Sequence, residues 1–478
     1  MDFEGFEPAP ELRAYLNIGF PWDELTGDYV PGKDGEEILN GGLMPFTGFC
    51  GGGNMYKSTL AHSQNLTAIE RYLSVKSMVY DTEPPSCSYK RFAMLMRHIN
   101  PDFVADPQLT ELKKRLLLTD ITKMMGNEWF AMMQKFRDSK VANLKKIMLK
   151  TPMLLGDGTQ LTEPMIHTAE IDSLSMMVLE STMKLLEENE LGDGGANIEA
   201  MKTQGAKTQM LMQIPQMSTE ANIFFIMTAH TGKQYQLDPR TPPSKQMTFL
   251  KQDVKLKNVP EKFTFLPNNL YHVVKCEVLL NRTTKAPEYP RRPEESNSGN
   301  TDLMLLTVIN LRGKGGPTGV PLELIVSQSE GFQPELSALR YLKANEGYGM
   351  GGNDKNYFLE FYPDCKLSRT TVRAKCSEDA RLRRALELTG SLCQMHNYWH
   401  DSRRAILLTP TQIVEKINEL GYDWNDLLDT RGFWQYDDEN ADKRNYMSTK
   451  DLLRMAHGTY IPKWYKKPLK VSTAAQPA

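Results

Sequence analysis

The chain has 478 residues, a formal net charge of −2 at pH 7, 40% hydrophobic residues and 24% charged residues. This length predicts either one large domain with an extension or two to three domains. A mean hydropathy of −0.47, without any long uncharged apolar run, excludes a membrane-spanning helix. Because the net charge is close to zero, binding to nucleic acid would require local basic patches.

The cysteines and the first residues of the chain indicate a cytoplasmic protein. The six cysteines have no regular spacing, which is typical of reduced thiols. The segment Met1-Asp2-Phe3-Glu4 lacks the basic and apolar regions of a secretory signal peptide. We therefore expect a protein that is not exported.

Composition and periodicity divide the chain into regions. Residues 1–42 are rich in Gly and Pro and are expected to form a lead-in segment with little helix. Residues 43–345 alternate apolar strand-like runs with helical stretches, which predicts an α/β fold with a mostly parallel sheet flanked by helices. The expected strands are Phe46–Cys50, Ser77–Tyr80, Ile166–Ile171, Ile223–Met227, Val274–Leu280, Leu303–Asn310 and Leu322–Val326.

Two further parts of the chain have a mainly helical pattern. Residues 95–161 contain the expected helices Leu109–Leu118 and Trp129–Lys150, and we interpret them as a helical insertion in the sheet topology. Glycine-rich residues at 347–352 mark a boundary, after which residues 346–478 are expected to form a mainly helical C-terminal domain and tail. The expected helices there are Glu378–Leu388, Thr411–Leu420 and Thr449–His457.

A glycine-rich loop joins the first expected strand to the helix that follows it. Its residues are Gly51, Gly52, Gly53, Asn54, Met55, Tyr56, Lys57, Ser58 and Thr59. This order is that of a P-loop, in which backbone N–H groups and the helix N-terminus hold a phosphate. Lys57 would reach the β/γ oxygens and Ser58 would offer its hydroxyl to Mg²⁺, so the loop predicts ATP and Mg²⁺ as ligands. Tyr56 stands where the motif expects glycine, and an ordinary flexible turn with a solvated lysine is the alternative interpretation.

Polar residues that suit triphosphate hydrolysis follow three later strands. Glu83 is the candidate for orienting the attacking water, because ligands of open α/β sheets bind at the carboxyl ends of the strands. Asp172 is the candidate for the water shell of Mg²⁺, although Glu170 is an unusual residue inside a central strand. His230 follows a strongly apolar strand and is the candidate sensor of the γ-phosphate. Each could instead be a plain polar residue at a strand end.

The order of these elements resembles that of the RecA-fold ATPases, most closely the UvsX-type recombinases of T4-like phages. In that family an aromatic residue precedes the P-loop lysine, as Tyr56 does here. The family's Asp-Ser-Glu, Asp-Ser and Asn-His-Thr strand ends are similar to Asp81-Thr82-Glu83, Asp172-Ser173 and Ala229-His230-Thr231. The resemblance covers roughly residues 15–345. The helical insertion, the polar strand before Asp172 and the enlarged C-terminal part depart from the family.

The resemblance implies a RecA-like P-loop core and a DNA-dependent ATPase. Such a protein forms filaments on single-stranded DNA and pairs it with a homologous duplex in phage recombination, repair and replication. Arg312 and Lys314 resemble the basic residues that reach a neighbouring protomer's ATP, although a plain hairpin turn is the alternative. Phage single-strand-binding and mediator proteins would be further partners, and a phage-encoded protein would act in the host cytoplasm. Phe6-Glu7-Pro8-Ala9 also matches a Phe-x-x-Ala pattern by which some recombinases contact the next protomer.

Two loops are candidates for DNA contact. Residues 231–270 interleave cations with aromatic rings, which suits phosphate neutralisation and base stacking. The earlier loop, residues 188–207, is glycine-rich and is expected to order on a ligand. The DNA-binding candidates are Lys202, Lys207, Lys233, Tyr235, Arg240, Lys245, Lys251, Lys255 and Lys257. A solvated surface loop remains the alternative for both segments.

Other interpretations remain open at this stage. A hexameric replicative helicase shares the P-loop and would form rings, but the segment before the P-loop is short for the helical domain that such helicases usually carry. A mediator that binds DNA with an inactive nucleotide site is a further alternative. Cys393, His396 and His400 lie on one face of an expected helix, yet their spacing fits no common zinc pattern.

Overall fold

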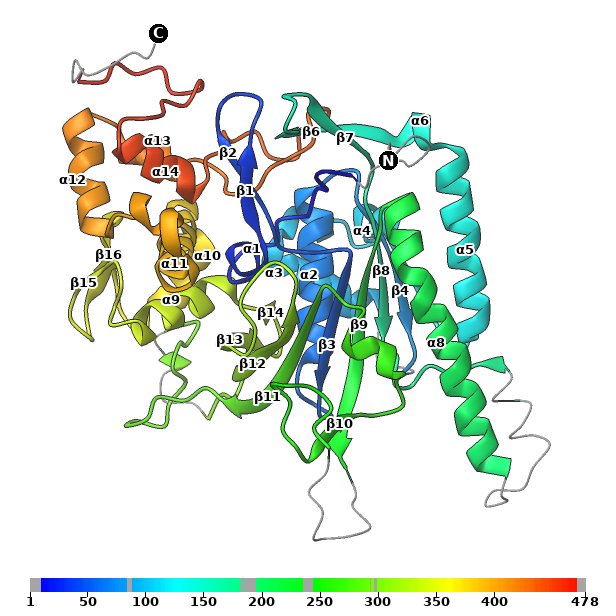
Figure 1. Ribbon diagram of the computed structural model, residues 1–478. Helices are drawn as coiled ribbons and strands as arrows, with labels where there is room; N and C mark the ends of the chain where they lie inside the picture. The colour runs from blue at the N-terminus through cyan, green and yellow to red at the C-terminus, as the bar shows by residue number, and fades with distance from the viewer. Residues whose placement is uncertain are drawn as a thin grey trace.

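The computed structural model describes residues 10–83, 88–180, 183, 195–234, 244–292, 294–295 and 299–470, and for residues 195–202 and 401 it describes the backbone alone. Its centre is a 10-stranded sheet with the order β14-β13-β12-β11-β3-β9-β8-β4-β5, in which β10 pairs with β9 (Figure 1). Strands β11, β3, β9, β8, β4 and β5 are parallel to their neighbours in that series. The fold is therefore mixed α/β with a large, mostly parallel sheet.

Each expected strand of the sheet is present, with bounds that differ by a few residues. Strands β3 and β8 are buried along their whole length, because helices cover both faces of the sheet. The strands of the sheet are β3 (Phe46–Gly51), β4 (Lys76–Asp81), β5 (Leu116–Asp120), β8 (His167–Asp172), β9 (Ile223–Lys233), β10 (Val254–Leu256), β11 (Asn269–Val278), β12 (Leu303–Gly313), β13 (Pro321–Ser327) and β14 (Gly331–Phe332).

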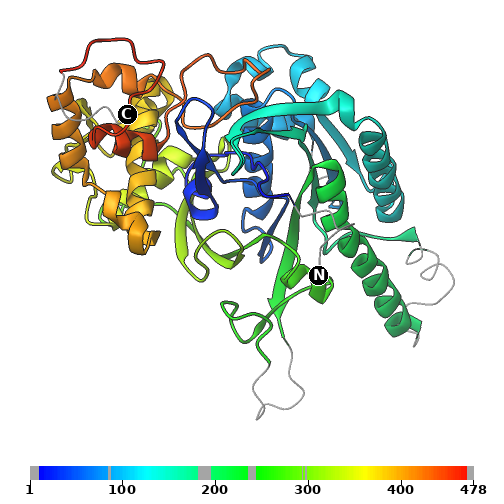
Figure 2. The same cartoon turned by 45° about the horizontal axis from the view of Figure 1, so that its top comes forward.

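Two pairs of helices cover the two faces of the sheet (Figures 1 and 2). On one face lie α2 (Lys57–Arg71) and α3 (Tyr89–Ile99), and on the other lie α5 (Gly126–Ala142) and α8 (Gly195–Ala221). Alternate residues of β9 separate the two layers: Phe224 packs with the α2 side, whereas Phe225 packs with the α8 side.

The prediction that residues 95–161 are a helical insertion is wrong in part. After the short helix α4 (Thr110–Arg115), the residues Leu116–Asp120 form β5, which pairs in parallel with β4 at the edge of the sheet. The expected helix Trp129–Lys150 ends earlier, at Ala142. The region also contains η1 (Pro101–Val104), which precedes α4, and α6 (Leu144–Ile147), which follows α5. After α6 the chain forms a hairpin of β6 (Met148–Leu154) and β7 (Gln160–Pro164).

The lead-in segment is more structured than its composition suggested. It contains α1 (Trp22–Thr26) and a hairpin of β1 (Asp28–Pro31) and β2 (Glu37–Asn40). Trp22 is 1% exposed and packs edge-on against Tyr271 of β11. The segment is thus part of the core, to which it contributes Trp22 together with other buried apolar side chains such as Leu16 and Ile38.

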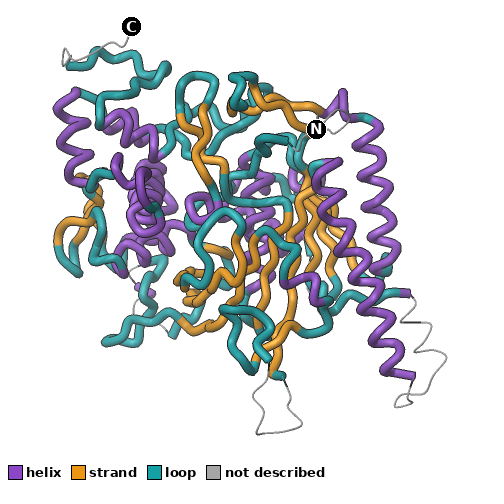
Figure 3. The backbone as a smooth tube through the Cα atoms, viewed as in Figure 1, coloured by secondary structure: helices purple, strands orange, loops and turns teal. Residues whose placement is uncertain are grey.

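The C-terminal part is mainly helical, as expected, but it also contains a three-stranded antiparallel sheet (Figure 3). Its hydrophobic core is continuous with the last strands of the large sheet, because Leu305 and Ile325 pack in the same cluster as Leu386 of α11. Its elements are α9 (Pro334–Ala344), β15 (Met350–Gly352), β16 (Tyr357–Leu359), β17 (Tyr362–Leu367), α10 (Val372–Glu378), α11 (Ala380–Tyr398), η4 (Asp401–Ile406), α12 (Pro410–Leu420), α13 (Trp424–Leu428) and α14 (Thr449–Ala456).

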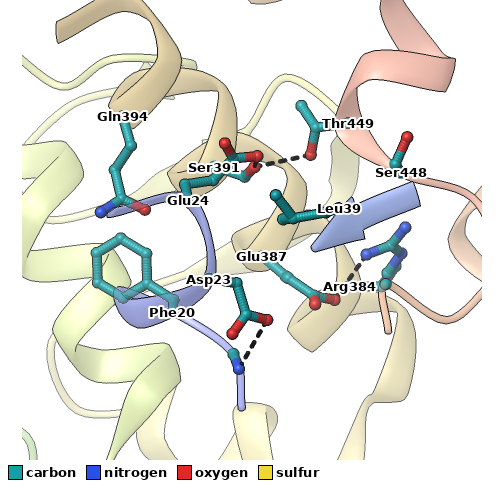
Figure 4. A pocket seen from close by; sticks show the side chains of 12 residues that line it. Phe20, Asp23, Glu24, Leu39, Arg384, Glu387, Ser391, Gln394, Ser448 and Thr449 are labelled. Carbon is teal, nitrogen blue, oxygen red and sulfur yellow. Dashed lines mark hydrogen bonds and ion pairs between the residues drawn. The ribbon is translucent and has the colours of Figure 1, made fainter. Parts of the chain in front are cut away.

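The lead-in segment and the C-terminal helices meet around a small polar cavity (Figure 4). Asp23 accepts hydrogen bonds from the backbone N–H groups of Ile18 at 2.7 Å and Gly19 at 2.9 Å. Burial is the main reason that the pKa of Asp23 rises to about 7. On the opposite wall, Arg384 of α11 donates to Glu387 at 2.7 Å. None of the residues predicted to act on a nucleotide lines this cavity.

Within the described ranges, no helix is both long enough and apolar enough to cross a membrane.

Candidate functional site

The glycine-rich loop connects β3 directly to α2. Strand β3 ends at Gly51 and α2 begins at Lys57. The loop between them therefore lies at the carboxyl end of β3. Gly51 needs to be small, because a Cβ there would lie 3.0 Å from the Val273 carbonyl oxygen. Tyr56 has φ 57° in the left-handed region, which explains why glycine is usually favoured at this position. Its half-buried ring packs against the core beneath α2, so hydrophobic contact offsets the backbone strain.

Lys57 is a buried lysine and not the solvated lysine of an ordinary turn. It is 5% exposed, and its Nζ donates a hydrogen bond to the Gly52 carbonyl at 2.7 Å. Burial lowers the pKa of Lys57, while the negative charges of Asp172 and Glu83 act in the opposite direction. The loop therefore curls around its own ammonium group, close to both candidate carboxylates.

Glu83, which follows β4, and His230, which lies within β9, are in direct contact. The His230 Nε2 atom lies 2.6 Å from Glu83 Oε1, and Ser173 Oγ donates to the same oxygen at 2.9 Å. The backbone N–H of His230 donates to Ser175 Oγ at 2.8 Å. The side chains of Glu83 and His230 are 37% and 23% exposed, so the pair is open on one side. The sequence could not show this contact, because 146 residues lie between Glu83 and His230 in the chain.

Asp172 lies at the end of β8 and is 7% exposed. Its Oδ1 accepts a hydrogen bond from Thr228 Oγ1 at 2.5 Å. With the Ser58 hydroxyl at the start of α2, it offers the hard oxygen ligands that Mg²⁺ prefers. Among the described residues, no group of three or more His, Cys, Asp and Glu side chains is arranged to hold a metal. A metal at this edge would therefore depend on oxygens of a bound nucleotide, as P-loop sites do.

Sequence reasoning identified Glu170 as unusual but missed the residues that accommodate it. Glu170 is fully buried, and its carboxylate contacts His62 Nδ1 at 2.5 Å and Asn65 Nδ2 at 2.8 Å. Both partners lie on α2, one helical turn apart. A buried carboxylate requires polar partners, and polar residues at this spacing in the helix after the glycine-rich loop were the available signal.

Arg312 lies at the end of β12, and Lys314 follows that strand directly. Arg312 pairs with Leu270, which pairs with Gly48 near the start of β3. Arg312 Nε donates to the Pro267 carbonyl at 2.8 Å, whereas the Lys314 side chain is exposed. Arg312 is therefore level with the middle of β3 and two strands away from it, and Lys314 lies further toward the start of β3, so neither residue is aligned with Gly51 of its own chain.

The predicted DNA loop after His230 is partly a two-stranded ribbon. Strand β9 continues to Lys233 and pairs with β10, with Lys255 opposite Gly232. The backbone N–H of Lys257 donates to the His230 carbonyl at 2.8 Å, which joins the ribbon to the candidate sensor. The exposed basic residues of this region are Lys233, Lys245, Lys251, Lys255 and Lys257. Tyr235 and Arg240 lie outside the described residues.

Lys207, a predicted DNA contact, is buried in the structure, so its side chain does not reach the surface in this conformation. Lys207 is 2% exposed, and its Nζ donates to the carbonyls of Leu174 at 2.8 Å and Asn258 at 3.2 Å. Burial lowers its pKa to about 8. Lys207 belongs to α8, which begins at Gly195, so the flexible loop expected over 188–207 is helical in its second half. The side chain of Lys202 lies outside the described part of the chain.

Of two other motifs, one forms no metal cluster among the described residues and the other lies outside them. Cys393 is buried in the C-terminal core, and His396 Nε2 lies 3.2 Å from the Leu408 carbonyl oxygen. The Phe6-Glu7-Pro8-Ala9 segment precedes the first described residue.

The chain matches no protein-family model. No curated protein is similar to it. Among solved structures, it is similar to the crystal structure of the RadB recombinase, with 14% sequence identity and a TM-score of 0.33 over 62% of this chain and 93% of that one. This likeness is too weak to indicate a function, so a function can be inferred only from the residues of the site.

Proposed function

We propose that the chain is a RecA-like, DNA-dependent ATPase that acts as a recombinase on single-stranded DNA. The observation that carries this proposal is the convergence of Lys57, Glu83, Asp172 and His230 at the carboxyl ends of adjacent parallel strands. Ligands of open α/β sheets bind at this edge.

The P-loop residues 51–59 would bind the phosphates of ATP. Lys57 would exchange its hydrogen bond with the Gly52 carbonyl for phosphate oxygens, and the N-terminus of α2 would add backbone N–H groups. Ser58 and Asp172 would hold Mg²⁺ and its water shell. Bound Mg²⁺ would neutralise phosphate charge during transfer of the γ-phosphoryl group to water.

Glu83 would orient the attacking water, and His230 would sense the γ-phosphate. Their 2.6 Å contact supports a coupled role, since a group that binds one partner must alter the position of the other. The ribbon of β9 and β10 follows His230 immediately, so the state of the nucleotide would alter the DNA contacts of Lys251, Lys255 and Lys257.

A neighbouring protomer would complete the site. Arg312 and Lys314 lie two strands from β3 and are not aligned with Gly51 of their own chain, which supports a role at the ATP of an adjacent chain. Charge stabilisation in trans would make hydrolysis depend on assembly. We propose a helical filament, with homologous duplex DNA as the second substrate and phage single-strand-binding and mediator proteins as further partners.

Electron microscopy tests this proposal and separates it from its alternatives. The protein is imaged with single-stranded DNA and a slowly hydrolysed ATP analogue, and without nucleotide as the control. The proposal predicts nucleotide-dependent helical filaments. Closed rings would instead indicate the hexameric helicase, and DNA binding that is unchanged by nucleotide would indicate the mediator.

A further inference from the structure

A row of polar side chains runs between α2 and β8 inside an otherwise apolar layer. Thr168, Glu170 and Asp172 alternate along β8, so they share the face that meets α2. Asn65 of α2 accepts from Thr168 Oγ1 at 2.7 Å and donates to Glu170 Oε2 at 2.8 Å. The row ends at Asp172, the candidate metal ligand.

His62 lies between the two carboxylates of this row. Its Nδ1 lies 2.5 Å from Glu170 Oε1, and its Nε2 lies 3.9 Å from Asp172 Oδ2. The imidazole packs against the Phe92 ring with 4.7 Å between ring centroids, which fixes the plane of the ring. The His62 side chain is only 5% exposed, so water does not replace these contacts.

Such a row is costly to bury if it serves stability alone. Buried polar groups are often no more stabilising than apolar residues of the same volume, because they lose their hydration. Here the buried groups lead to Asp172: Thr228 donates to Oδ1 at 2.5 Å, and the His62 imidazole faces Oδ2 at 3.9 Å, which is beyond hydrogen-bond distance. One oxygen of the carboxylate is thus hydrogen-bonded to Thr228, and the other has the His62 imidazole as its neighbour on the α2 side.

We propose that His62 is a positioning residue for the divalent cation of the nucleotide site. It orients Asp172 from inside the fold, and Glu170 in turn orients the imidazole. Outer partners of this kind fix the direction of a metal-binding group, and their loss typically weakens metal affinity by about 10- to 100-fold. The inference rests on the proposed function, since it assigns Asp172 to the metal.

The test measures Mn²⁺ binding by electron paramagnetic resonance on the full chain, with a non-hydrolysable ATP analogue at saturation. The variants are His62→Phe, Glu170→Gln and the control His98→Phe, whose histidine lies on α3 beside Gln333. The first two should weaken Mn²⁺ binding by about 10- to 100-fold, the effect typical of outer-shell loss. The control should match the wild type, and analogue binding in EDTA should be equal in all four proteins.

Mn²⁺ affinity within twofold of wild type in folded His62→Phe would overturn the inference. If that variant does not fold, Glu170→Gln decides by the same criterion, because it keeps the shape of the side chain but presents a donor to His62 or Asn65. A wild type that binds no analogue would refute the proposed function itself. Wild-type binding with unaltered variants would refute only the role of His62.

Discussion

The contact between Glu83 and His230 gives the sharpest prediction about turnover. If His230 holds Glu83 for water activation, His230→Ala should lower kcat for DNA-stimulated ATP hydrolysis. The lost interaction is one hydrogen bond to a carboxylate at 2.6 Å. Such a bond is worth about 1.5–3 kcal/mol, which corresponds to a fall in kcat of roughly 10- to 150-fold. Ser173 still donates to the same oxygen at 2.9 Å, so the lower half of this range is expected.

A double-mutant cycle isolates the coupling between the two residues. Glu83→Gln alone should lower kcat by about 10²- to 10⁴-fold, as loss of a general base does, while ATP binding is retained. His230→Ala should then have little further effect in the Glu83→Gln background, because the group that it orients is gone. The assay is steady-state phosphate release with saturating single-stranded DNA and ATP. Effects that multiply independently would refute the idea that His230 acts through Glu83.

Further predictions concern stability and DNA contact. Because burial raises the pKa of Asp23 from 3.8 to about 7, the folded state holds this proton more tightly than the unfolded state. The free energy of unfolding should therefore fall as pH rises from about 4 to 7, and Asp23 should account for at most roughly 4 kcal/mol of that fall. The measurement is urea unfolding of the wild type and of Asp23→Asn at pH 5 and pH 8, and the variant should lose less stability between the two pH values than the wild type does. Lys207→Met should leave single-stranded DNA affinity unchanged in fluorescence anisotropy, and a loss of more than threefold in a folded variant would restore Lys207 as a DNA contact. Replacing Lys251, Lys255 and Lys257 by Ala should weaken DNA binding. It should also reduce the magnitude of the slope of the logarithm of the DNA-binding constant against the logarithm of the salt concentration by about 2, because each phosphate contact contributes about 0.7. An unchanged slope would exclude this ribbon from the DNA interface.

The sequence predicted what is local and missed what depends on distant contacts. Strand β3, the loop and α2 follow one another within a short segment, so spacing alone indicated their order. The run Leu116-Leu117-Leu118 was assigned to a helix because it continues a helical pattern, and only pairing with β4 makes it a strand. Short apolar runs are ambiguous in this way.

The environment of charged residues also depends on tertiary packing. Lys207 looked like a surface cation because lysine is seldom fully buried, yet two backbone carbonyls accept from its ammonium group. Glu170 could be recognised as unusual, but its partner His62 could be identified only after α2 and β8 were packed together. Identifying such pairs requires the tertiary structure.

Binding of Mg²⁺-ATP to the resting protein tests the central claim most directly. Isothermal titration calorimetry with a non-hydrolysable analogue should show one site per chain. Lys57→Ala should weaken that site by roughly 10- to 150-fold, the equivalent of one charged hydrogen bond of about 1.5–3 kcal/mol. A wild type that binds no nucleotide, or a folded Lys57→Ala that binds it equally well, would contradict the account.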